Sequence, residues 1–362
     1  MTTTISCETA RAWVDVDLGA LAANAKTVAA IAGGRLLPMV KANGYGLGAI
    51  PVVQALEPLE PWGYGVASTV EAAELRAGGI ARPIVLFTPL LPAWIDRCLA
   101  LDVRPAIGDL EALRAWTARS ERPFHLEIDT GMSRAGFRYD DPALRDAAGA
   151  LLDAAPGWEG AFTHFHSPGC ESATELQWAR LCAALTTLPR RPALVHAANS
   201  AAAVRGRRYT ADLVRPGIFL YGGGETTPSP RPVAAFRARV VALRRVAAGA
   251  TVSYGGDWRA ERPTTIATVA AGYADGVVRA EGRPRHIELN GRRVPVVGRV
   301  AMDMIMVALA DDHAVSLGDI ATIWGGLVSL DEQARATGTI SYELLTALGP
   351  RVPRRYAPEP PR

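Results

Sequence analysis

Lysine is nearly absent from this sequence. Only Lys26 and Lys41 are lysines among 39 basic residues, and every other basic residue is arginine. The abundance of alanine, glycine and proline indicates a GC-rich genome, which accounts for most of this excess. A desolvated lysine amine can lose its proton near neutral pH, whereas a guanidinium stays charged. Lys26 lies in an alanine-rich helical stretch and is interpreted as a solvated residue, so Lys41 is the candidate for chemistry that arginine cannot perform.

Cysteine is also scarce. The four cysteines stand at positions 7, 98, 170 and 182, and their spacing forms no CxxC pair or zinc-binding pattern. The sequence therefore predicts no metal site. So few cysteines in a chain of 362 residues are typical of a reducing compartment.

Long apolar runs and blocks of like charge are missing as well. No stretch of about 18 apolar residues occurs, so we expect no transmembrane helix. The first residues, MTTTISCETARAW, lack the basic and apolar regions of a signal peptide. The net charge of +3 comes from interspersed charges of both signs, which argues against nucleic-acid binding. The expectation is a cytoplasmic protein that binds neither membrane nor nucleic acid.

Strand and helix patterns alternate through the first part of the chain, which is long enough for a large barrel and a second domain. Eight β-rich runs are separated by alanine- and leucine-rich segments of helical period. The strand candidates are Leu36–Val40, Gly63–Ala67, Ile84–Phe87, Val103–Ile107, Phe124–Ile128, Gly160–Phe165, Ala193–His196 and Leu213–Leu220. Eight such units predict an α/β fold, the (β/α)8 TIM barrel.

The strand candidates become more closely spaced after about Pro230. Asn290-Gly291 separates two β runs, and both residues tolerate the positive φ of a tight hairpin turn. This part is therefore predicted to be mostly β. The predicted domains are a cofactor-binding barrel over residues 12–230 and a β domain over residues 231–362, with residues 1–11 and the strand near residues 13–18 packing on the latter.

Reactive side chains fall where the predicted barrel strands end. Lys41 follows the first strand, Arg134 lies beyond the fifth, and His164 ends the sixth. Ser200 follows the seventh strand, and Arg215 belongs to the eighth. Taken singly, each has an ordinary explanation as a packed histidine, an ion-paired arginine or a turn residue. Because active sites of TIM barrels lie at this end of the strands, their convergence indicates a site for an anionic cofactor held through a Schiff base.

Nine motifs that span nearly the whole chain carry a more specific signal. They are WVDVDLGALAAN, VKANGYGLGA, EIDTGMSRAGF, THF, HAANSAA, VRPGIFLYG, VSYGGDW, AAGYADGVVR and VGRVAMDM. In this order they resemble the alanine racemases, a family of fold-type III enzymes that use pyridoxal 5′-phosphate. The resemblance implies interconversion of L-alanine and D-alanine, which would supply D-alanine for bacterial peptidoglycan.

The resemblance also implies two catalytic bases. Lys41 would hold the cofactor and act on one face of the substrate Cα, and Tyr254 would act on the opposite face. Inversion needs such a pair, because one group removes the proton and the other delivers one from behind. Tyr254 would come from the partner chain of a homodimer. A tyrosine needs help to act as a base, and the resemblance assigns that help to His164 and Arg215.

Further positions follow from the same motifs. Arg215 would face the cofactor ring nitrogen and weaken the electron sink, because a guanidinium does not give up its proton. Arg134 would lie near the cofactor phenolic oxygen and the substrate carboxylate. The residues expected to contact the phosphate are Tyr45, Ser200, Gly217 and Ile218. The residues expected to enclose the substrate from the partner chain are Met302, Tyr273 and Asp303.

Three positions depart from the family pattern. Glu127 stands where some relatives carry a carbamylated lysine, and we expect its carboxylate to orient Arg134 directly. Leu47 replaces a common histidine, a change that the family tolerates. Pro350 occupies the place of a phosphate-contacting tyrosine, so either the cofactor is bound more weakly or Tyr356 compensates.

Other functions remain open on the sequence alone. The same chemistry could act on serine or a larger amino acid, since pocket walls decide substrate size. A fold-type III decarboxylase is a further alternative, although VSYGGDW and GYADGVVR match racemases better. A cofactor-binding homeostasis protein would lack the β domain and Tyr254.

Overall fold

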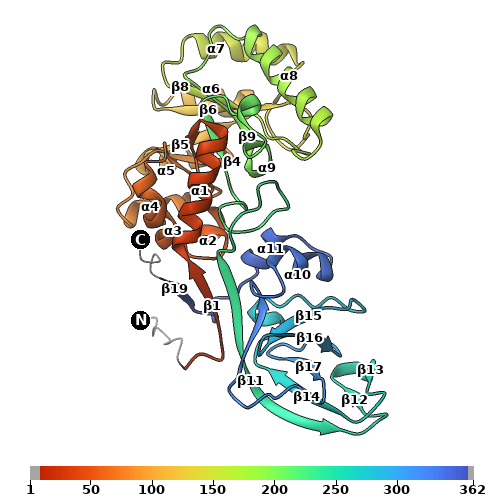
Figure 1. The fold of residues 1–362 in the computed structure, drawn as a ribbon. Helices are drawn as coiled ribbons and strands as arrows, with labels where there is room; N and C mark the ends of the chain where they lie inside the picture. Colours follow the sequence, from red (N-terminus) through yellow and green to blue (C-terminus); the bar gives the residue numbers. More distant parts are fainter. Residues whose placement is uncertain (1–8, 358–362) are drawn as a thin grey trace.

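The structure, a computed structural model, describes residues 9–357 of the chain. A barrel forms one lobe and a β domain forms the other, with the long strand β11 (Ala234–Val246) leading from the first into the second (Figure 1). The expected packing of residues 1–11 falls mainly on residues 1–8, which lie outside the described residues. Within the described part, no helix is long and apolar enough to span a membrane.

Eight parallel strands build the barrel, as the sequence predicts. They are β2 (Arg35–Leu36), β3 (Tyr64–Val66), β4 (Ile84–Pro89), β5 (Val103–Ile107), β6 (Phe124–Asp129), β8 (Trp158–Phe162), β9 (Leu194–Asn199) and β10 (Leu213–Arg215), while β7 (Phe137–Arg138) pairs with β6 alone. The sheet runs β2-β10-β9-β8-β6-β5-β4-β3. Backbone hydrogen bonds of 2.9 Å from Val40 to Gly65 and from Gly65 to Pro38 join its two ends and close the barrel.

Three of the eight predicted barrel strands are too long. The first and sixth runs were expected to reach Val40 and Phe165, but β2 stops at Leu36 and β8 stops at Phe162. The eighth run was expected to reach Leu220, but β10 stops at Arg215 and the chain then turns. Pro216 explains the stop, because proline has no N–H to donate to a sheet ladder. The backbone N–H groups that follow, those of Gly217 and Ile218, are thereby kept out of the sheet.

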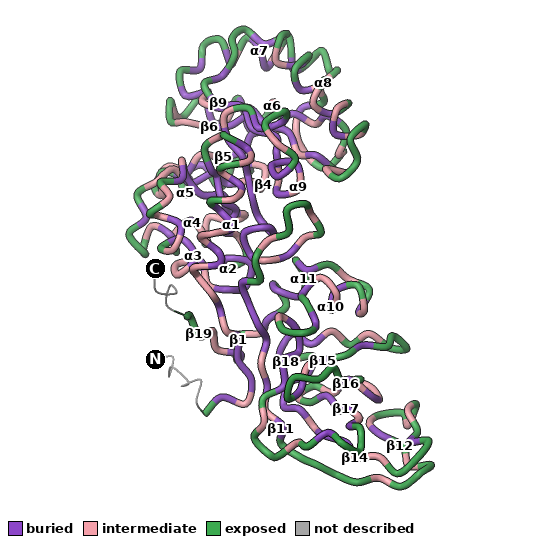
Figure 2. The backbone as a smooth tube through the Cα atoms, viewed as in Figure 1, coloured by how far each residue is buried: buried purple, intermediate pink, exposed green. Residues whose placement is uncertain are grey.

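Helices connect the barrel strands and cover them. They are α1 (Leu18–Ala32), α2 (Lys41–Tyr45), α3 (Ala49–Leu56), α4 (Thr69–Ala77), α5 (Ile95–Ala100), α6 (Leu110–Thr117), the π-turn η3 (Leu144–Ala148), α7 (Gly149–Asp153), α8 (Glu171–Thr187) and α9 (Ser200–Ala203), with short 3₁₀ turns η1 (Glu57–Leu59), η2 (Pro92–Trp94) and η4 (Arg207–Tyr209). Local sequence sets their starts: Ser68 and Glu71 form a capping box on α4, and Asp109 caps α6. β6 is buried from Phe124 to Ile128 (Figure 2), although His125 and Glu127 alternate with its apolar residues.

The second lobe is a sheet in the order β14-β17-β16-β15-β18-β11-β1-β19. Its strands are β1 (Ala12–Asp17), β11, β14 (Thr264–Val269), β15 (His286–Leu289), β16 (Arg292–Val297), β17 (Ile305–Leu309), β18 (Ile320–Trp324) and β19 (Arg354–Ala357), with a side pair β12 (Thr251–Val252) and β13 (Trp258–Arg259). β1 pairs antiparallel with β11, so the start of the chain belongs to this sheet. The Asn290-Gly291 hairpin is confirmed, with φ of 46° and 72°.

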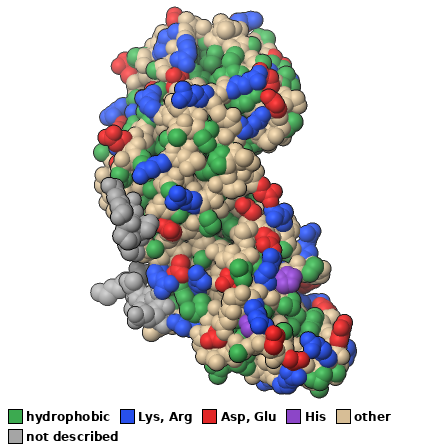
Figure 3. Space-filling view, in the orientation of Figure 1, with side chains coloured by type: hydrophobic (Ala, Val, Ile, Leu, Met, Phe, Trp, Pro, Cys, Tyr) green, Lys and Arg blue, Asp and Glu red, His purple; other side chains and the backbone are tan. Residues whose placement is uncertain are grey.

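Two helices of the second lobe were not expected from the sequence. α10 (Leu330–Thr337) and α11 (Ser341–Thr346) accompany the 3₁₀ turns η5 (Tyr254–Gly256) and η6 (Tyr273–Asp275). α11 packs against α2 at the carboxyl end of the barrel strands, where the lobes meet (Figure 1). Charges of both signs are interspersed on the face shown in Figure 3.

Replacing Gly46 by alanine should disrupt the contact between α2 and α11. Gly46 has φ of 79°, and a Cβ there would lie 2.2 Å from the carbonyl oxygen of Leu345. Gly79 is the matched control, since its φ is 82° but nothing lies within 4 Å of an added Cβ. Gly46→Ala should lower the free energy of unfolding by about 1–3 kcal/mol more than Gly79→Ala. Equal effects in urea titrations would contradict the packing described.

Candidate active site

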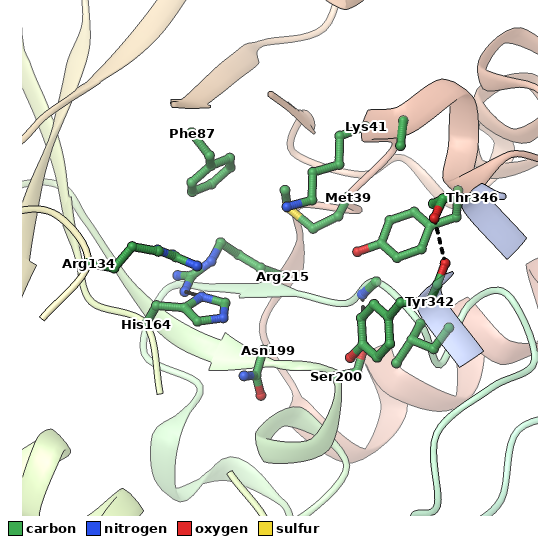
Figure 4. A pocket seen from close by; sticks show the side chains of 14 residues that line it. Met39, Lys41, Phe87, Arg134, His164, Asn199, Ser200, Arg215, Tyr342 and Thr346 are labelled. Atoms are coloured by element: carbon green, nitrogen blue, oxygen red, sulfur yellow. Dashed lines mark hydrogen bonds between the residues drawn. The ribbon is translucent and has the colours of Figure 1, made fainter. Parts of the chain in front are cut away.

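A cavity of about 310 Å³ opens at the carboxyl ends of the barrel strands. Its lining residues come from the barrel loops and from α11: Met39, Lys41, Ala42, Tyr45, Phe87, Arg134, His164, Asn199, Ser200, Arg215, Gly217, Ile218, Tyr342 and Thr346. All eight cofactor-contacting residues predicted from the sequence are in this set. Figure 4 shows Lys41 between an arginine and histidine group on one side and Ser200 with Tyr342 on the other.

Lys41 begins a turn of left-handed helix. The next four residues, Ala42 to Tyr45, have φ between 52° and 59°. Only Gly44 adopts this conformation freely, and it costs other residues about 1–2 kcal/mol each. Such strain persists only where neighbouring groups hold the backbone, and it concentrates at functional sites.

Two side chains hold this strained turn. Glu71 accepts a 2.7 Å hydrogen bond from the Ala42 N–H with one carboxylate oxygen and caps the start of α4 with the other. The side-chain oxygen of Asn43 accepts a 2.8 Å hydrogen bond from the Ala49 N–H at the start of α3. The turn that carries Lys41 is therefore fixed to two helices.

The Lys41 amine has no hydrogen-bond or ion-pair partner among the described residues. Burial lowers the pKa of Lys41, the charges of Arg134 and Arg215 lower it further, and Glu71 opposes them. A lowered pKa makes the unprotonated, nucleophilic amine more available near neutral pH. The environment thus supports the chemistry for which the sequence singled out this lysine.

Arg215 is buried and held by hydrogen bonds from both of its Nη atoms. Its Nη1 donates to Nδ1 of His196 at 2.7 Å, and its Nη2 donates to the carbonyl oxygens of Thr163 and Ala197 at 2.7 and 3.0 Å. Its Nε–H has no acceptor among the described residues. Burial lowers the pKa of Arg215 to about 9, which leaves the guanidinium charged at neutral pH.

His164 lies against Arg215 and is neutral. Its Nδ1 is 3.3 Å from Nη2 of Arg215, whose two protons also serve the closer carbonyls of Thr163 and Ala197, so this third contact is a weaker, shared hydrogen bond. Because a guanidinium can only donate, Nδ1 is the acceptor in it. The proton of the neutral ring is therefore on Nε2. Burial, with the charges of Arg215 and Arg134, lowers the pKa of His164 to about 3. The group that His164 offers is an N–H donor.

Arg134 reaches the cavity from the loop after β6. Asp129 shapes this loop by accepting hydrogen bonds of 2.9, 2.9 and 3.1 Å from the N–H groups of Gly131, Met132 and Ser133. The Arg134 guanidinium has no hydrogen-bond or ion-pair partner in residues 9–357. It is thus available to bind a carboxylate, to which guanidinium geometry is matched.

Glu127 does not contact Arg134 in the way the sequence suggested. Its side chain is buried, and Oε2 has no hydrogen-bond partner among the described residues. Burial raises the pKa of Glu127, while the charges of Arg134 and Arg215 oppose this shift. Asp129, rather than Glu127, fixes the loop that carries Arg134, so Glu127 acts on that arginine through charge alone.

Opposite the arginines, several donors surround a space suited to an anion. Ser200 Oγ accepts hydrogen bonds from the N–H groups of Gly217 and Phe219 at 2.8 and 3.3 Å, which leaves its own O–H free to donate. The Ile218 N–H has no acceptor among the described residues. Burial raises the pKa of Tyr45, so its O–H remains a donor. A Cβ on Gly217 would lie 2.3 Å from the Tyr45 oxygen, so glycine keeps this space open.

Tyr342 of α11 joins these donors. Its ring centroid lies 6.0 Å from that of Tyr45, and its side chain lines the cavity beside Ser200 (Figure 4). Tyr356, suggested as the compensation for Pro350, donates instead to the Leu47 carbonyl at 2.9 Å and does not line the cavity. That suggestion is therefore wrong, and the hydroxyl near the anion space comes from a different turn of the chain.

The residues expected to act from a partner chain lie elsewhere. Tyr254, Tyr273 and Met302 are 69%, 45% and 52% exposed, and neither they nor Asp303 line the cavity of their own chain. Tyr254 begins η5 directly after Ser253, whose φ of 68° is another strained conformation. All four side chains belong to the second lobe, and Asp303 is half-buried.

A buried carboxylate fixes part of this set of side chains. Asp275 accepts hydrogen bonds from Arg11 at 2.7 Å and Arg351 at 2.8 Å, and Arg351 also donates to Asp303 at 2.7 Å. The Tyr273 N–H donates to the Ala301 carbonyl at 3.0 Å. The exposed side chains are thus presented from an ordered frame.

Sequence reasoning missed several cavity residues. Met39, Phe87, Tyr342 and Thr346 line the cavity without having been assigned a role, and His196 holds Arg215 from behind. The pattern Ser341–Thr346, a short polar and apolar helix, was the signal that could have located α11. Nothing in its sequence indicates that it reaches the barrel mouth, because that depends on how the two lobes pack.

Comparison with known proteins agrees with this geometry. Residues 16–225 match the family model "Alanine racemase, N-terminal domain", and residues 233–356 match "Alanine racemase, C-terminal domain". The chain is 39% identical to the alanine racemase of Deinococcus radiodurans over 357 residues, covering 95% of this chain and 99% of that protein.

Solved structures show the same similarity. The biosynthetic alanine racemase of Pseudomonas aeruginosa is 36% identical, with a TM-score of 0.88 over 96% of this chain and 100% of that chain. The alanine racemase of Bartonella henselae, solved with covalently bound pyridoxal phosphate, is 30% identical, with a TM-score of 0.89 over 96% of this chain and 100% of that one. The chain therefore belongs to the alanine racemase family.

Proposed function

We propose that this protein interconverts L-alanine and D-alanine with pyridoxal 5′-phosphate, and so supplies D-alanine for peptidoglycan. The observation that carries the proposal is the unpaired Lys41 amine, which lies in one cavity between the arginine group and the anion space. When bound, the cofactor withdraws electrons from the substrate Cα and eases removal of its proton.

The residues of the cavity fit this cofactor. We assign the phosphate to the donors of Tyr45, Ser200, Ile218 and Tyr342. Gly217 lines the same space, but its N–H already donates to Ser200 Oγ, so its part is to leave room for the phosphate. We assign the ring nitrogen to the Nε–H of Arg215, which has no acceptor among the described residues. Arg134 is left to bind the phenolic oxygen of the cofactor and the substrate carboxylate, while Lys41 holds the cofactor covalently.

We assign the two proton transfers to Lys41 and to Tyr254 of the partner subunit in a homodimer. The exposure of Tyr254 at 69% and its distance in the fold from its own cavity support a role in a second chain's site. The Nε2–H of His164 is free to donate to a phenolate oxygen, which would favour the basic form of that tyrosine. Met302, Tyr273 and Asp303 of the partner subunit would enclose the substrate.

We place the reaction in the cytoplasm. The three cysteines of the described part, Cys98, Cys170 and Cys182, are free thiols. Reduced cysteines suit the compartment in which peptidoglycan precursors are built.

The purified protein should racemise L-alanine in deuterated water and incorporate deuterium at Cα. Lys41→Arg should fold as the wild type does but neither bind the cofactor covalently nor racemise, because a guanidinium does not condense with an aldehyde. Lys26→Arg is the matched control, because it changes the other, exposed lysine. Optical rotation measures racemisation, mass spectrometry measures deuterium at Cα, and visible absorption measures covalent binding of the cofactor. Release of carbon dioxide without inversion would overturn the proposal.

Tyr254→Phe should impair the two enantiomers unequally. Without the phenolic oxygen, exchange of the Cα proton should fall by about 100-fold or more from one enantiomer, while Lys41 still acts on the other. Deuterium exchange measured separately from L-alanine and D-alanine compares the two. Equal losses would show that Tyr254 is not one base of an opposed pair.

Tyr342→Phe should weaken cofactor binding about tenfold, the value of one hydrogen bond to a charged group. Tyr356→Phe removes a hydroxyl that is bonded to Leu47 instead and should leave the affinity unchanged. The dissociation constant of the cofactor, measured by tryptophan fluorescence, decides between them. A greater loss of cofactor affinity in Tyr356→Phe than in Tyr342→Phe would show that Tyr356, and not Tyr342, contacts the phosphate.

A further inference from the structure

A line of hydrogen bonds runs from the cavity wall through the barrel interior toward the amino ends of the strands. Arg215 Nη1 and His196 Nδ1 are 2.7 Å apart, His196 Nε2 and His125 Nδ1 are 2.7 Å apart, and His125 Nε2 and Glu159 Oε2 are 3.1 Å apart. Glu159 ends the line by accepting from Arg104 Nε at 2.7 Å. We call these five residues the interior chain.

Only one arrangement of protons satisfies the interior chain with neutral histidines. A guanidinium can only donate, so Nδ1 of His196 accepts from Arg215 and its proton is on Nε2. That proton is donated to Nδ1 of His125, whose own proton is therefore also on Nε2 and is donated to Glu159. The direction of every hydrogen bond follows from the arginine in the cavity wall.

Space for the interior chain is built into the barrel. TIM-barrel interiors are commonly filled by branched apolar side chains, yet His125 and His196 are both fully buried here. A Cβ on Gly160 would lie 2.7 to 2.8 Å from three atoms of the His125 ring, so glycine at this strand position makes room for it. A buried polar line of this kind is costly unless every member is paired, as each member here is.

Aromatic rings enclose the chain. The His196 ring stacks on Phe162 with centroids 4.9 Å apart and planes at 8°. The Arg215 guanidinium lies 5.6 Å from the centroid of Phe87 and 5.3 Å from that of Phe162. These rings restrict the chain to one orientation, which a water-filled channel would not do.

We propose that the interior chain positions Arg215, with His196, His125 and Glu159 as positioning residues that keep its Nε–H directed into the cavity. The inference rests on the proposed function, in which that N–H faces the cofactor ring nitrogen. Nη1 is bonded to His196, and Nη2 is bonded to the Thr163 and Ala197 carbonyls, so the guanidinium cannot rotate without breaking these hydrogen bonds. A fixed donor keeps the ring nitrogen unprotonated and thereby limits loss of the substrate amino group to the cofactor as a side reaction.

The electrostatics of the chain agree with this role. Burial lowers the pKa of both His125 and His196, so both stay neutral. Burial alone would raise the pKa of Glu159, but the hydrogen bond from His125 and the charge of Arg104 outweigh it and lower the pKa overall. The carboxylate therefore remains a charged acceptor at the far end.

The test uses the cofactor-loaded protein and three variants. His196→Phe keeps the ring stacking but removes the acceptor for Arg215. Glu159→Leu removes the carboxylate that accepts from His125 at the other end of the interior chain. Glu159→Gln retains an acceptor for His125. The first readout is the absorption spectrum of the bound cofactor, recorded against pH without substrate. The second is the amount of pyruvate released per alanine racemised, because each pyruvate released leaves one amino group on the cofactor.

His196→Phe should shift the absorption of the bound cofactor and raise the pyruvate released per alanine racemised on the order of tenfold. Glu159→Leu should change both in the same direction but by less. Glu159→Gln should restore wild-type values. Glu175→Leu, which removes an ion pair of α8 with Arg208 and a hydrogen bond from Tyr209, is the control and should change neither readout. Wild-type absorption and ratio in both His196→Phe and Glu159→Leu would overturn the proposal.

Spectra of wild-type protein labelled with ¹⁵N-histidine test the chain even where His196→Phe does not fold. Both buried histidines should be Nε2–H tautomers that do not titrate around neutral pH. An Nδ1–H tautomer at either position would contradict the proposed direction. Failure of the wild type to bind pyridoxal phosphate or racemise alanine would instead refute the proposed function, and the spectra would still report on the hydrogen bonds.

Discussion

Three cationic side chains share one partly buried cavity, and the rest of the site depends on this concentration of charge. Lys41, Arg134 and Arg215 make no hydrogen bond to a carboxylate within the described residues. Cations removed from water and left unpaired are costly, so the cavity favours an anionic ligand and lowers the proton affinity of the lysine. The free Ser200 hydroxyl and the space beside Gly217 extend this preference to a second anionic group.

Supporting structure keeps the charges apart and oriented. The left-handed turn after Lys41 is held by Glu71 and Asn43, and Arg215 is held from behind by His196 and backbone carbonyls. The strained backbone after Lys41 and the buried polar groups behind Arg215 both cost stability. A fold keeps such features where function requires them. Both place a nitrogen without an internal partner at the cavity surface.

The sequence predicted the parts of the fold that follow from local patterns. Eight apolar runs with intervening helices identified the barrel, and Asn290-Gly291 identified a hairpin, because both signals depend on neighbouring residues. The end of β10 was missed because Pro216 was not weighed as a strand terminator. Tyr342 and the interior chain could not be predicted, since α11 reaches the cavity through packing of the lobes and His125 meets His196 through barrel closure. Glu127 shows the limit of motif transfer, because a residue that departs from the family pattern did not make the contact expected at its position.

The proposed active site is formed by two chains, with Lys41 from one and Tyr254 from the other. Co-expression of Lys41→Arg and Tyr254→Phe chains tests this most directly, because a mixed dimer would contain one site with both bases intact and one with neither. Each variant alone should be inactive in racemisation, and random pairing of equal amounts should restore about a quarter of the wild-type specific activity. A mixture as inactive as its parents, with mixed dimers demonstrated by mass spectrometry, would contradict the account.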